Sequence, residues 1–384
     1  MDLSIKLIYN GYFFLIIPVW FYLISHKDKH EKFRNLILNL DAKYFYSMCL
    51  AFFIPSFLFM IGYGLHYTDV DNAISSGAIE FLNGHNVYIE SVVEHMPKNV
   101  QTFSIYHYFP ADLLFHALIY VVLGQFIYNL TPFLNTYWFA IGYLPLLPVS
   151  IYLFKQLINL PWKRSLIVYV MFFQAVYFNN AFLTVTLFML GLYLIHYTKN
   201  YHLGIIVWIF SSSSKYITGI FVFFYFINDV KKYFANRKTI SEKKSLSNEL
   251  LIIMNDFKGY IIGSALFVLL MIPFGVKEVL SAVFLYQGNI SERSEVAEIE
   301  GPILVELLKY FNLLNYYMPL FLLLIVLLIL VVLLKMPNKP YLQSITVATI
   351  IMLLFPYIGT ELYATPLFGM FFVLLNDKFA SKVE

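Results

Sequence analysis

The sequence predicts an all-α integral membrane protein with about ten to twelve transmembrane or re-entrant helices in a single domain, residues 1–384. Three observations lead to this fold class. The chain is 60% hydrophobic and only 13% charged, so its apolar surface exceeds what one soluble core would bury. Apolar runs of roughly 20 residues, the length that crosses a bilayer, recur from one end to the other. One long polar segment, 66–110, interrupts them and predicts a large first outer loop.

The apolar runs define the expected helices in order. The first run has no basic leading region and no small-residue cleavage site, so we expect it to be retained as an anchor rather than removed as a signal peptide. The candidate spans are 8–25, 44–65, 111–130, 137–154, 165–181, 182–198, 203–229, 259–274, 316–335, 341–357 and 361–376.

Basic residues between the runs predict the orientation of the chain. They gather between the first two runs and in the segment 231–258, so both should be cytoplasmic, the second as a basic loop beside anionic lipid. A third cluster, around Lys155, fits this scheme only if one preceding run is not a full crossing. Run 111–130 contains His116 and ends at a Thr-Pro break, so we expect it to be re-entrant or interfacial.

The run 203–229 has basic residues on both sides, which predicts that the chain enters the membrane and returns. We expect two short helices that meet near the outer face, with the turn close to residues 211–215. This topology leaves two sizeable outward segments, 66–110 and 276–302, as the places where chemistry is expected.

The first outer loop begins with two carboxylates, Asp69 and Asp71, directly after the second apolar run. Such a pair could hold a divalent cation such as Mg²⁺ or Mn²⁺, or one carboxylate could act as a general base. A solvated acidic loop start is the alternative interpretation. Acidic groups pressed against a bilayer are costly unless they are used or paired, which favours a functional role. The single cysteine, Cys49, gives little support to disulfides, zinc or thiol catalysis.

The order of motifs in this loop resembles the first luminal loop of GT-C superfamily glycosyltransferases. The matching strings are residues 67–71 (YTDVD), a short amphipathic helix that ends at a glycine cap, residues 83–88 (NGHNVY) and residues 108–110 (YFP). The nearest groups are the catalytic subunit of GPI mannosyltransferase I and the polyprenol-phosphate-mannose-dependent mannosyltransferases. Val87 stands where those proteins usually have proline.

The resemblance implies a GT-C-like fold and inverting transfer of a hexose, mannose above all, from a polyprenyl-phosphate donor to a lipid or glycan acceptor. Asp69 or Asp71 would be the catalytic base. The other substrate-binding candidates are polar or basic residues expected on the outer side: His107, Tyr108, Lys215, Arg293 and Glu361. Each also has an ordinary interpretation as a packed, snorkelling, solvated or paired side chain.

Two other functions remain open on the sequence. A transporter or flippase for a lipid-linked saccharide or small solute is the first alternative, although transporters place ionisable residues near the bilayer midplane. A polysaccharide polymerase or ligase is the second alternative. It is disfavoured because such enzymes usually rely on a late outer loop rich in Arg and His, whereas the segment 276–302 has one Arg and no His. Membrane lipid is an expected partner and nucleic acid is not. We expect the plasma membrane if the source is prokaryotic, which residue usage favours, and the endoplasmic reticulum if it is eukaryotic.

Overall fold

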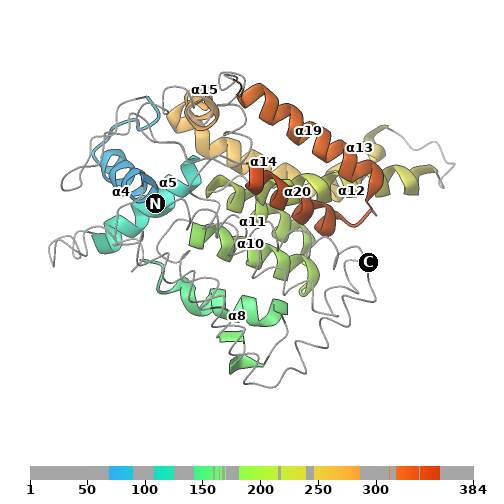
Figure 1. The fold of residues 1–384 in the computed structure, drawn as a ribbon, viewed down its shortest axis with the longest axis horizontal. Coiled ribbons are helices and arrows are strands. Elements are labelled where there is room, and N and C mark those ends of the chain that lie inside the picture. The colour runs from blue at the N-terminus through green and yellow to red at the C-terminus, as the bar shows by residue number, and fades with distance from the viewer. Residues whose placement is uncertain are drawn as a thin grey trace.

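The computed structural model describes residues 69–89, 108–124, 142–158, 161–163, 165–166, 169, 181–214, 218–238, 246–285, 311, 317–336 and 338–354. Within these ranges every regular element is a helix, and none is a β-strand (Figure 1). The all-helical class expected from the sequence is therefore confirmed for the described part of the chain.

The N-terminal part of the described chain forms helices α4 (Asp69–Leu82), α5 (Pro110–Ile119) and α8 (Leu146–Ile158). Pro110 occupies the first turn of α5 after an extended Phe109, a position where the missing N–H of proline has no helical partner to lose. Helix α5 continues into a short π-helix, η1 (Tyr120–Gly124). Helices α4 and α5 pack against each other.

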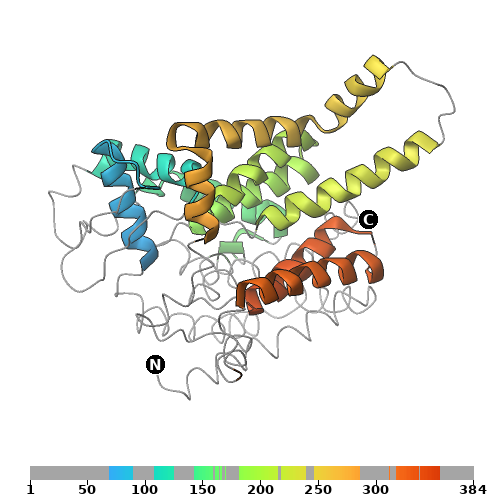
Figure 2. The ribbon, with the colours of Figure 1, turned by 90° about the horizontal axis from the view of Figure 1, so that it is seen from above.

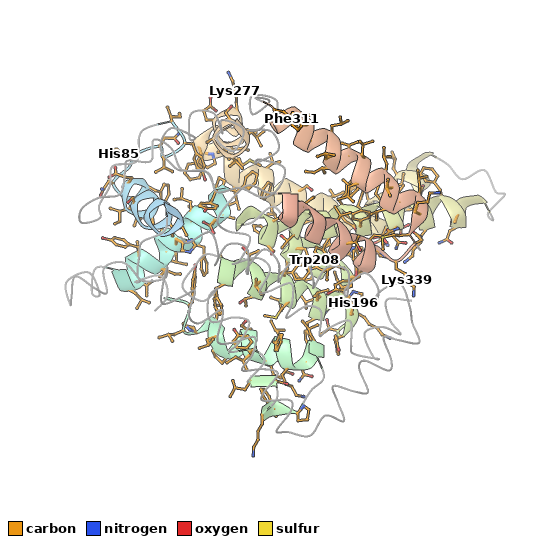
Figure 3. The ribbon with its side chains drawn as sticks, in the orientation of Figure 1. His85, His196, Trp208, Lys277, Phe311 and Lys339 are labelled. Atoms are coloured by element: carbon orange, nitrogen blue, oxygen red, sulfur yellow. The ribbon has the colours of Figure 1, made fainter. Side chains whose placement is uncertain are left out.

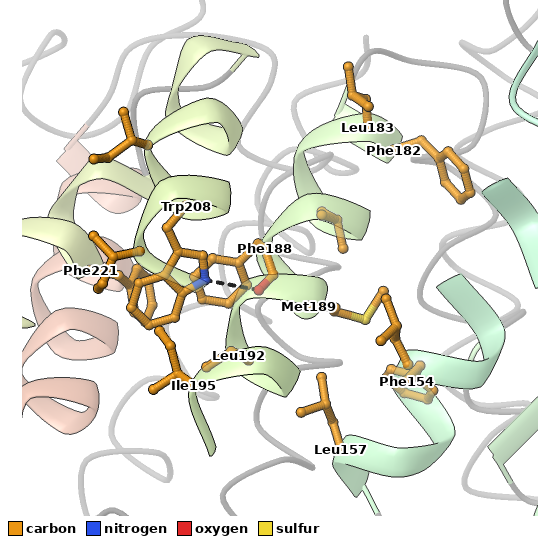
Figure 4. Packing of buried hydrophobic residues seen from close by; sticks show 14 of the residues in the cluster. Phe154, Leu157, Phe182, Leu183, Phe188, Met189, Leu192, Ile195, Trp208 and Phe221 are labelled. Carbon is orange, nitrogen blue, oxygen red and sulfur yellow. Dashed lines mark hydrogen bonds between the residues drawn. The ribbon is translucent and has the colours of Figure 1, made fainter. Parts of the chain in front are cut away.

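The centre of the fold is the antiparallel pair α10 (Ala181–His196) and α11 (Tyr201–Ser214) (Figure 1). Their axes approach closely because glycines line the contact: a Cβ on Gly191 would lie 2.3 Å from the Trp208 ring. The buried Trp208 stacks on Phe188 at 5.4 Å and donates its ring N–H to the Phe188 carbonyl at 3.0 Å (Figure 4). The close contact at Gly191 and the hydrogen bond of Trp208 therefore both fix the register of the two helices.

Five helical segments follow, and in Figure 2 the first two reach away from the centre together. Helix α14 packs on α11 along Gly259 and Gly263, and it turns through η3 and Gly275 into α15. The segments are α12 (Gly219–Lys238), α13 (Leu246–Asp256), α14 (Lys258–Met271), η3 (Ile272–Phe274) and α15 (Val276–Leu280), which continues as the π-helix η4 (Ser281–Leu285).

The last described helices are α19 (Tyr317–Lys335) and α20 (Pro340–Leu354), and α20 packs against α12. Several large apolar side chains of α19 are exposed, whereas Val332 is buried. The exposed set recurs at helical spacing and so covers one continuous face: Leu322, Leu323, Val326, Leu327, Leu330, Val331 and Leu334.

Several element predictions agree with the structure. The runs 182–198, 316–335 and 341–357 correspond to α10, α19 and α20. The run 203–229 is divided between α11 and α12, so two helices occupy it as expected. Residues 211–214, expected close to the turn, belong to α11. The segment 231–258, expected as a loop, is largely helical, because α12 continues to Lys238 and α13 follows.

The described helices differ in how far they meet the requirements of a membrane span, which must be both long and apolar. Taken singly, none of them combines the necessary length and apolar character, whereas α13 and α14 together do, with a bend of 75° between them. The predicted runs 8–25, 44–65 and 361–376 lie outside the described residues, as does nearly all of 165–181.

Candidate functional site

The strings at 83–88 and 108–110, which carry the sequence resemblance, are in contact in the structure. The Tyr88 hydroxyl donates a hydrogen bond to the Tyr108 carbonyl at 2.7 Å. The Asn86 side-chain amide donates to the Phe274 carbonyl at 3.1 Å, which ties the turn after α4 to η3. Three segments that are distant in sequence therefore meet at one place, immediately before the expected second outer segment.

An apolar cluster fixes this meeting point. The ring of Phe274 lies 5.3 Å from Tyr88 in an edge-on contact and 5.5 Å from Phe81. Val87, at the position where the resembling proteins have proline, is fully buried in the same cluster. Burial raises the pKa of the Tyr88 hydroxyl well above its ordinary value, and the nearby Asp112 carboxylate raises it further. Tyr88 is therefore a neutral hydrogen-bond donor at any physiological pH.

The turn after α4 closes the helix through a glycine. Gly84 has a φ of +91°, a left-handed conformation that L side chains rarely adopt, and it donates to the Phe81 carbonyl at 3.0 Å. The next residue, His85, donates its backbone N–H to the Glu80 carbonyl at 3.1 Å. This pair of bonds is the Schellman arrangement. The His85 ring also contacts the Glu80 carboxylate through Nδ1.

A second polar group lies inside α5, directly after the Tyr108 motif. Asp112 and His116 are both fully buried, and His116 Nδ1 lies 2.8 Å from the Asp112 carbonyl and 3.5 Å from its carboxylate. Because Nδ1 faces acceptors, the other ring nitrogen, Nε2, accepts from the Tyr143 hydroxyl at 2.5 Å. Burial of an ionisable pair costs desolvation free energy, so its presence in an apolar helix makes Asp112 and His116 candidate functional residues.

The site residues predicted from the sequence are only partly within the described ranges. Asp69 and Asp71 lie in the first turn of α4, where their backbone is helical, and their side chains lie outside the described part. Tyr108 is buried in the apolar cluster, and its carbonyl accepts from Tyr88. The others lie outside the described residues: His107, Lys215, Arg293 and Glu361.

A metal site finds no support among the side chains that the structure describes, because nowhere do three His, Cys, Asp or Glu residues converge there. A divalent cation at Asp69 and Asp71 therefore rests on the sequence alone.

Sequence reasoning did not single out Glu80 or Asp112. The signal for the second was present, since Asp112 and His116 stand four residues apart and so share a helix face. The signal for Glu80 is indirect: Gly84 predicts a helix cap, and in such a cap Glu80 is the residue whose carbonyl binds the N–H that follows the glycine.

Another polar cluster lies where α11, α12 and α14 meet. The Asp229 carboxylate accepts from the hydroxyls of Tyr201 and of Tyr260, the latter at 2.9 Å. Burial, with the neighbouring Tyr260 and Asp229, raises the pKa of the Tyr201 hydroxyl. Each group here satisfies another across a helix contact, so the cluster locks the register of three helices.

Comparison with known proteins gave no match to a family model, a curated protein or a solved structure.

Proposed function

We propose that this chain is a GT-C-like membrane glycosyltransferase that moves a hexose, mannose by resemblance, from a polyprenyl-phosphate donor to a lipid or glycan acceptor on the non-cytoplasmic face. The observation that supports the proposal best is the 2.7 Å hydrogen bond between Tyr88 and Tyr108. It joins two of the motifs on which the resemblance depends. Chance similarity of two short strings gives no reason for them to meet in space.

The proposed reaction is a displacement at the anomeric carbon of the donor sugar. Asp69 or Asp71 removes the proton of the acceptor hydroxyl as its oxygen bonds to that carbon. The bond from the carbon to the phosphate oxygen breaks, and the lipid leaves as polyprenyl phosphate. Inversion follows because the acceptor attacks from the side opposite the phosphate.

The remaining candidate residues would bind the two ends of the donor. Lys215 and Arg293 are proposed to face the phosphate, since a guanidinium can donate two parallel hydrogen bonds. His107 and Glu361 are proposed to contact the sugar or acceptor, and the buried Tyr108 to hold the adjoining turn in place through its bond to Tyr88. A Mg²⁺ or Mn²⁺ ion held by the two aspartates would instead act on the acceptor hydroxyl, by polarising its O–H bond.

A membrane setting is part of the proposal, and the exposed apolar face of α19 supports it. A contiguous apolar face of this kind is unusual on a soluble monomer, where it favours aggregation. In a bilayer the same face contacts lipid at no such penalty. We propose the plasma membrane for a prokaryotic source and the endoplasmic reticulum for a eukaryotic one.

A transporter or flippase remains the second candidate, and one observation favours it. The buried pair Asp112 and His116 lies in an apolar helix, which is where transporters hold coupling groups. Its test is separate: purified protein in liposomes would move a lipid-linked saccharide or a solute across the bilayer without converting it.

The proposed enzyme is tested with Asp69→Asn and Asp71→Asn in membranes supplied with polyprenyl-phosphate-mannose and an extract of candidate acceptors. Loss of a general base lowers turnover by about 10²- to 10⁴-fold, so at least one variant should lose transfer at unchanged protein abundance. Asp256→Asn is the matched control, since it removes an exposed carboxylate at the end of α13. Full transfer by both loop variants would refute the assignment of the base.

A further inference from the structure

The helix cap at the end of α4 contains a polar pair in a position that usually holds an apolar one. In a Schellman arrangement the residue after the glycine commonly makes a hydrophobic contact with the residue whose carbonyl it binds. Here those two residues are His85 and Glu80, and their side chains meet through a hydrogen bond. The Glu80 side chain is only 5% exposed. Capping alone does not call for a buried carboxylate, which is costly to desolvate.

The pair orients one ring nitrogen toward solvent. An ionised carboxylate can only accept, so Nδ1 of His85 carries the hydrogen that faces Glu80. The ring is 52% exposed and its other nitrogen, Nε2, is on the far side from the carboxylate. A histidine held in this way by a buried acid is a common arrangement for groups that bind or act on a ligand.

The other polar groups of the turn are already used within it. Asn86 donates to the Phe274 carbonyl, and its side-chain oxygen accepts from the Tyr88 backbone N–H at 3.2 Å. The backbone N–H groups of Gly84 and His85 bind helix carbonyls. The exposed polar side chains of residues 83–89 are therefore His85 and Asn83.

Two exposed apolar side chains stand before and after the histidine in the sequence. Leu82 is 41% exposed on the helix side, and Ile89 is 59% exposed on the other. An exposed polar ring in a turn that also exposes two apolar side chains matches a ligand that joins an anionic group to hydrocarbon. It matches a free inorganic anion less well, because that ligand leaves the apolar pair unused.

We propose that residues 82–89 bind the phosphate end of a polyprenyl phosphate, with His85 donating from Nε2 to a phosphate oxygen. Leu82 and Ile89 contact the first isoprene units. The identity of the lipid rests on the proposed function, which names a polyprenyl-phosphate donor. In its protonated form the ring donates from both nitrogens, one to Glu80 and one to the phosphate.

The position of this site along α4 is compatible with the proposed base. Asp69 and Glu80 are 11 residues apart in one helix, which is three turns and about 16 Å of axial rise, so the two positions share a face. In an inverting displacement the base and the leaving phosphate lie on opposite sides of the anomeric carbon. A base at position 69 and a phosphate contact beside position 80 fit that arrangement.

The test measures binding of a fluorescent polyprenyl monophosphate to the full-length protein in phosphatidylcholine nanodiscs. His85→Gln removes the imidazole ring and its Nε2 donor, and binding should weaken about tenfold or more, the effect of losing a hydrogen bond to a charged phosphate. The double variant Glu80→Leu with His85→Leu restores an apolar cap. We expect it to keep the unfolding temperature of the wild type and to lose binding to the same extent.

Lys277→Gln is the control for general electrostatics, because Lys277 is an exposed cation on the neighbouring α15, away from His85 (Figure 3). Its affinity should change less than twofold. Phosphatidylglycerol and inorganic phosphate serve as competitors, and both should compete far less well than unlabelled polyprenyl phosphate. Equal competition by either one would overturn the assignment of the lipid.

Unchanged binding in His85→Gln, retained binding in the double leucine variant, or an equal loss in Lys277→Gln would each overturn the proposed site. These outcomes are distinct from failure of the proposed function. Wild-type protein that binds the lipid but transfers no sugar would refute the enzyme and leave the site. Normal sugar transfer with normal lipid binding in His85→Gln would refute the site and leave the enzyme.

Discussion

Substitution of Gly191 by alanine tests the central packing of α10 on α11. A Cβ at this position would lie 2.3 Å from Cδ1 and 2.5 Å from Nε1 of Trp208, closer than real Cβ contacts come. The Trp208 ring has little freedom to move away. It is fully buried, stacked on Phe188 and hydrogen-bonded to the Phe188 carbonyl.

The expected loss of stability combines three effects. Overpacking of a dense interior costs about 1–3 kcal/mol. A displaced Trp208 also loses its hydrogen bond, which contributes about 1 kcal/mol. Alanine has the higher helix propensity, by about 1 kcal/mol over glycine, and this offsets part of the loss. The net prediction for Gly191→Ala is a destabilisation of about 2 kcal/mol.

The assay is unfolding of the purified protein in detergent, followed by intrinsic tryptophan fluorescence. Trp208 is one of four tryptophans, so the native spectrum of Gly191→Ala should also shift as its ring moves. Gly219→Ala is the matched control, because the nearest atom to its Cβ would be 3.7 Å away, an ordinary contact. That variant should be as stable as the wild type or slightly more so. Wild-type stability and an unchanged spectrum in Gly191→Ala would refute the packing of this helix pair.

Two further predictions concern the apolar cluster around Tyr88 and the surface of α19. Tyr88→Phe removes the bond to Tyr108 and should cost about 1 kcal/mol at pH 7. Because the pKa of Tyr88 is raised in the folded state, its contribution is fully present below about pH 10, where the unfolded tyrosine is neutral, and is lost as pH rises above that value. Between pH 8 and pH 11 the unfolding temperature should therefore fall less in Tyr88→Phe than in the wild type. An equal fall in the two proteins would contradict the raised pKa. A nitroxide attached at position Leu330 in a cysteine-free background should collide more with lipid-soluble oxygen than with an aqueous relaxation agent, and the opposite preference would contradict a lipid-facing α19.

Local signals in the sequence predicted a good part of the fold. Helices α19 and α20 follow from apolar runs bounded by polar residues and Pro340. The glycine cap after α4 follows from Gly84, because few other residues adopt a positive φ. The division of the run 203–229 into α11 and α12 follows from the basic residues on both sides of it. In each case the deciding interaction lies within a few residues of the signal.

Predictions that needed distant contacts did worse. Asp69 and Asp71 were expected in a loop, whereas their backbone belongs to the first turn of α4, where acidic residues are favoured by the helix dipole. The helical character of 231–258 was missed because a mixed-charge composition hid the apolar side of α13. The bond from Asn86 to the Phe274 carbonyl spans 188 residues, and no local pattern in either segment indicates it.

Helix α4 gives the proposed site a rigid frame. Ile74 and Ala78, between its two ends, are fully buried, so the helix is held against its neighbours along its length. A displacement reaction needs the base and the phosphate contact at a fixed separation, because a shift of about 1 Å can lower the rate a hundredfold. Groups carried by two flexible loops would not hold that separation. The proposed base at Asp69 lies at the start of α4, and the proposed phosphate contact at His85 lies in the turn that caps its other end. One packed helix therefore carries both groups, and the bond from Asn86 ties the capping turn to η3.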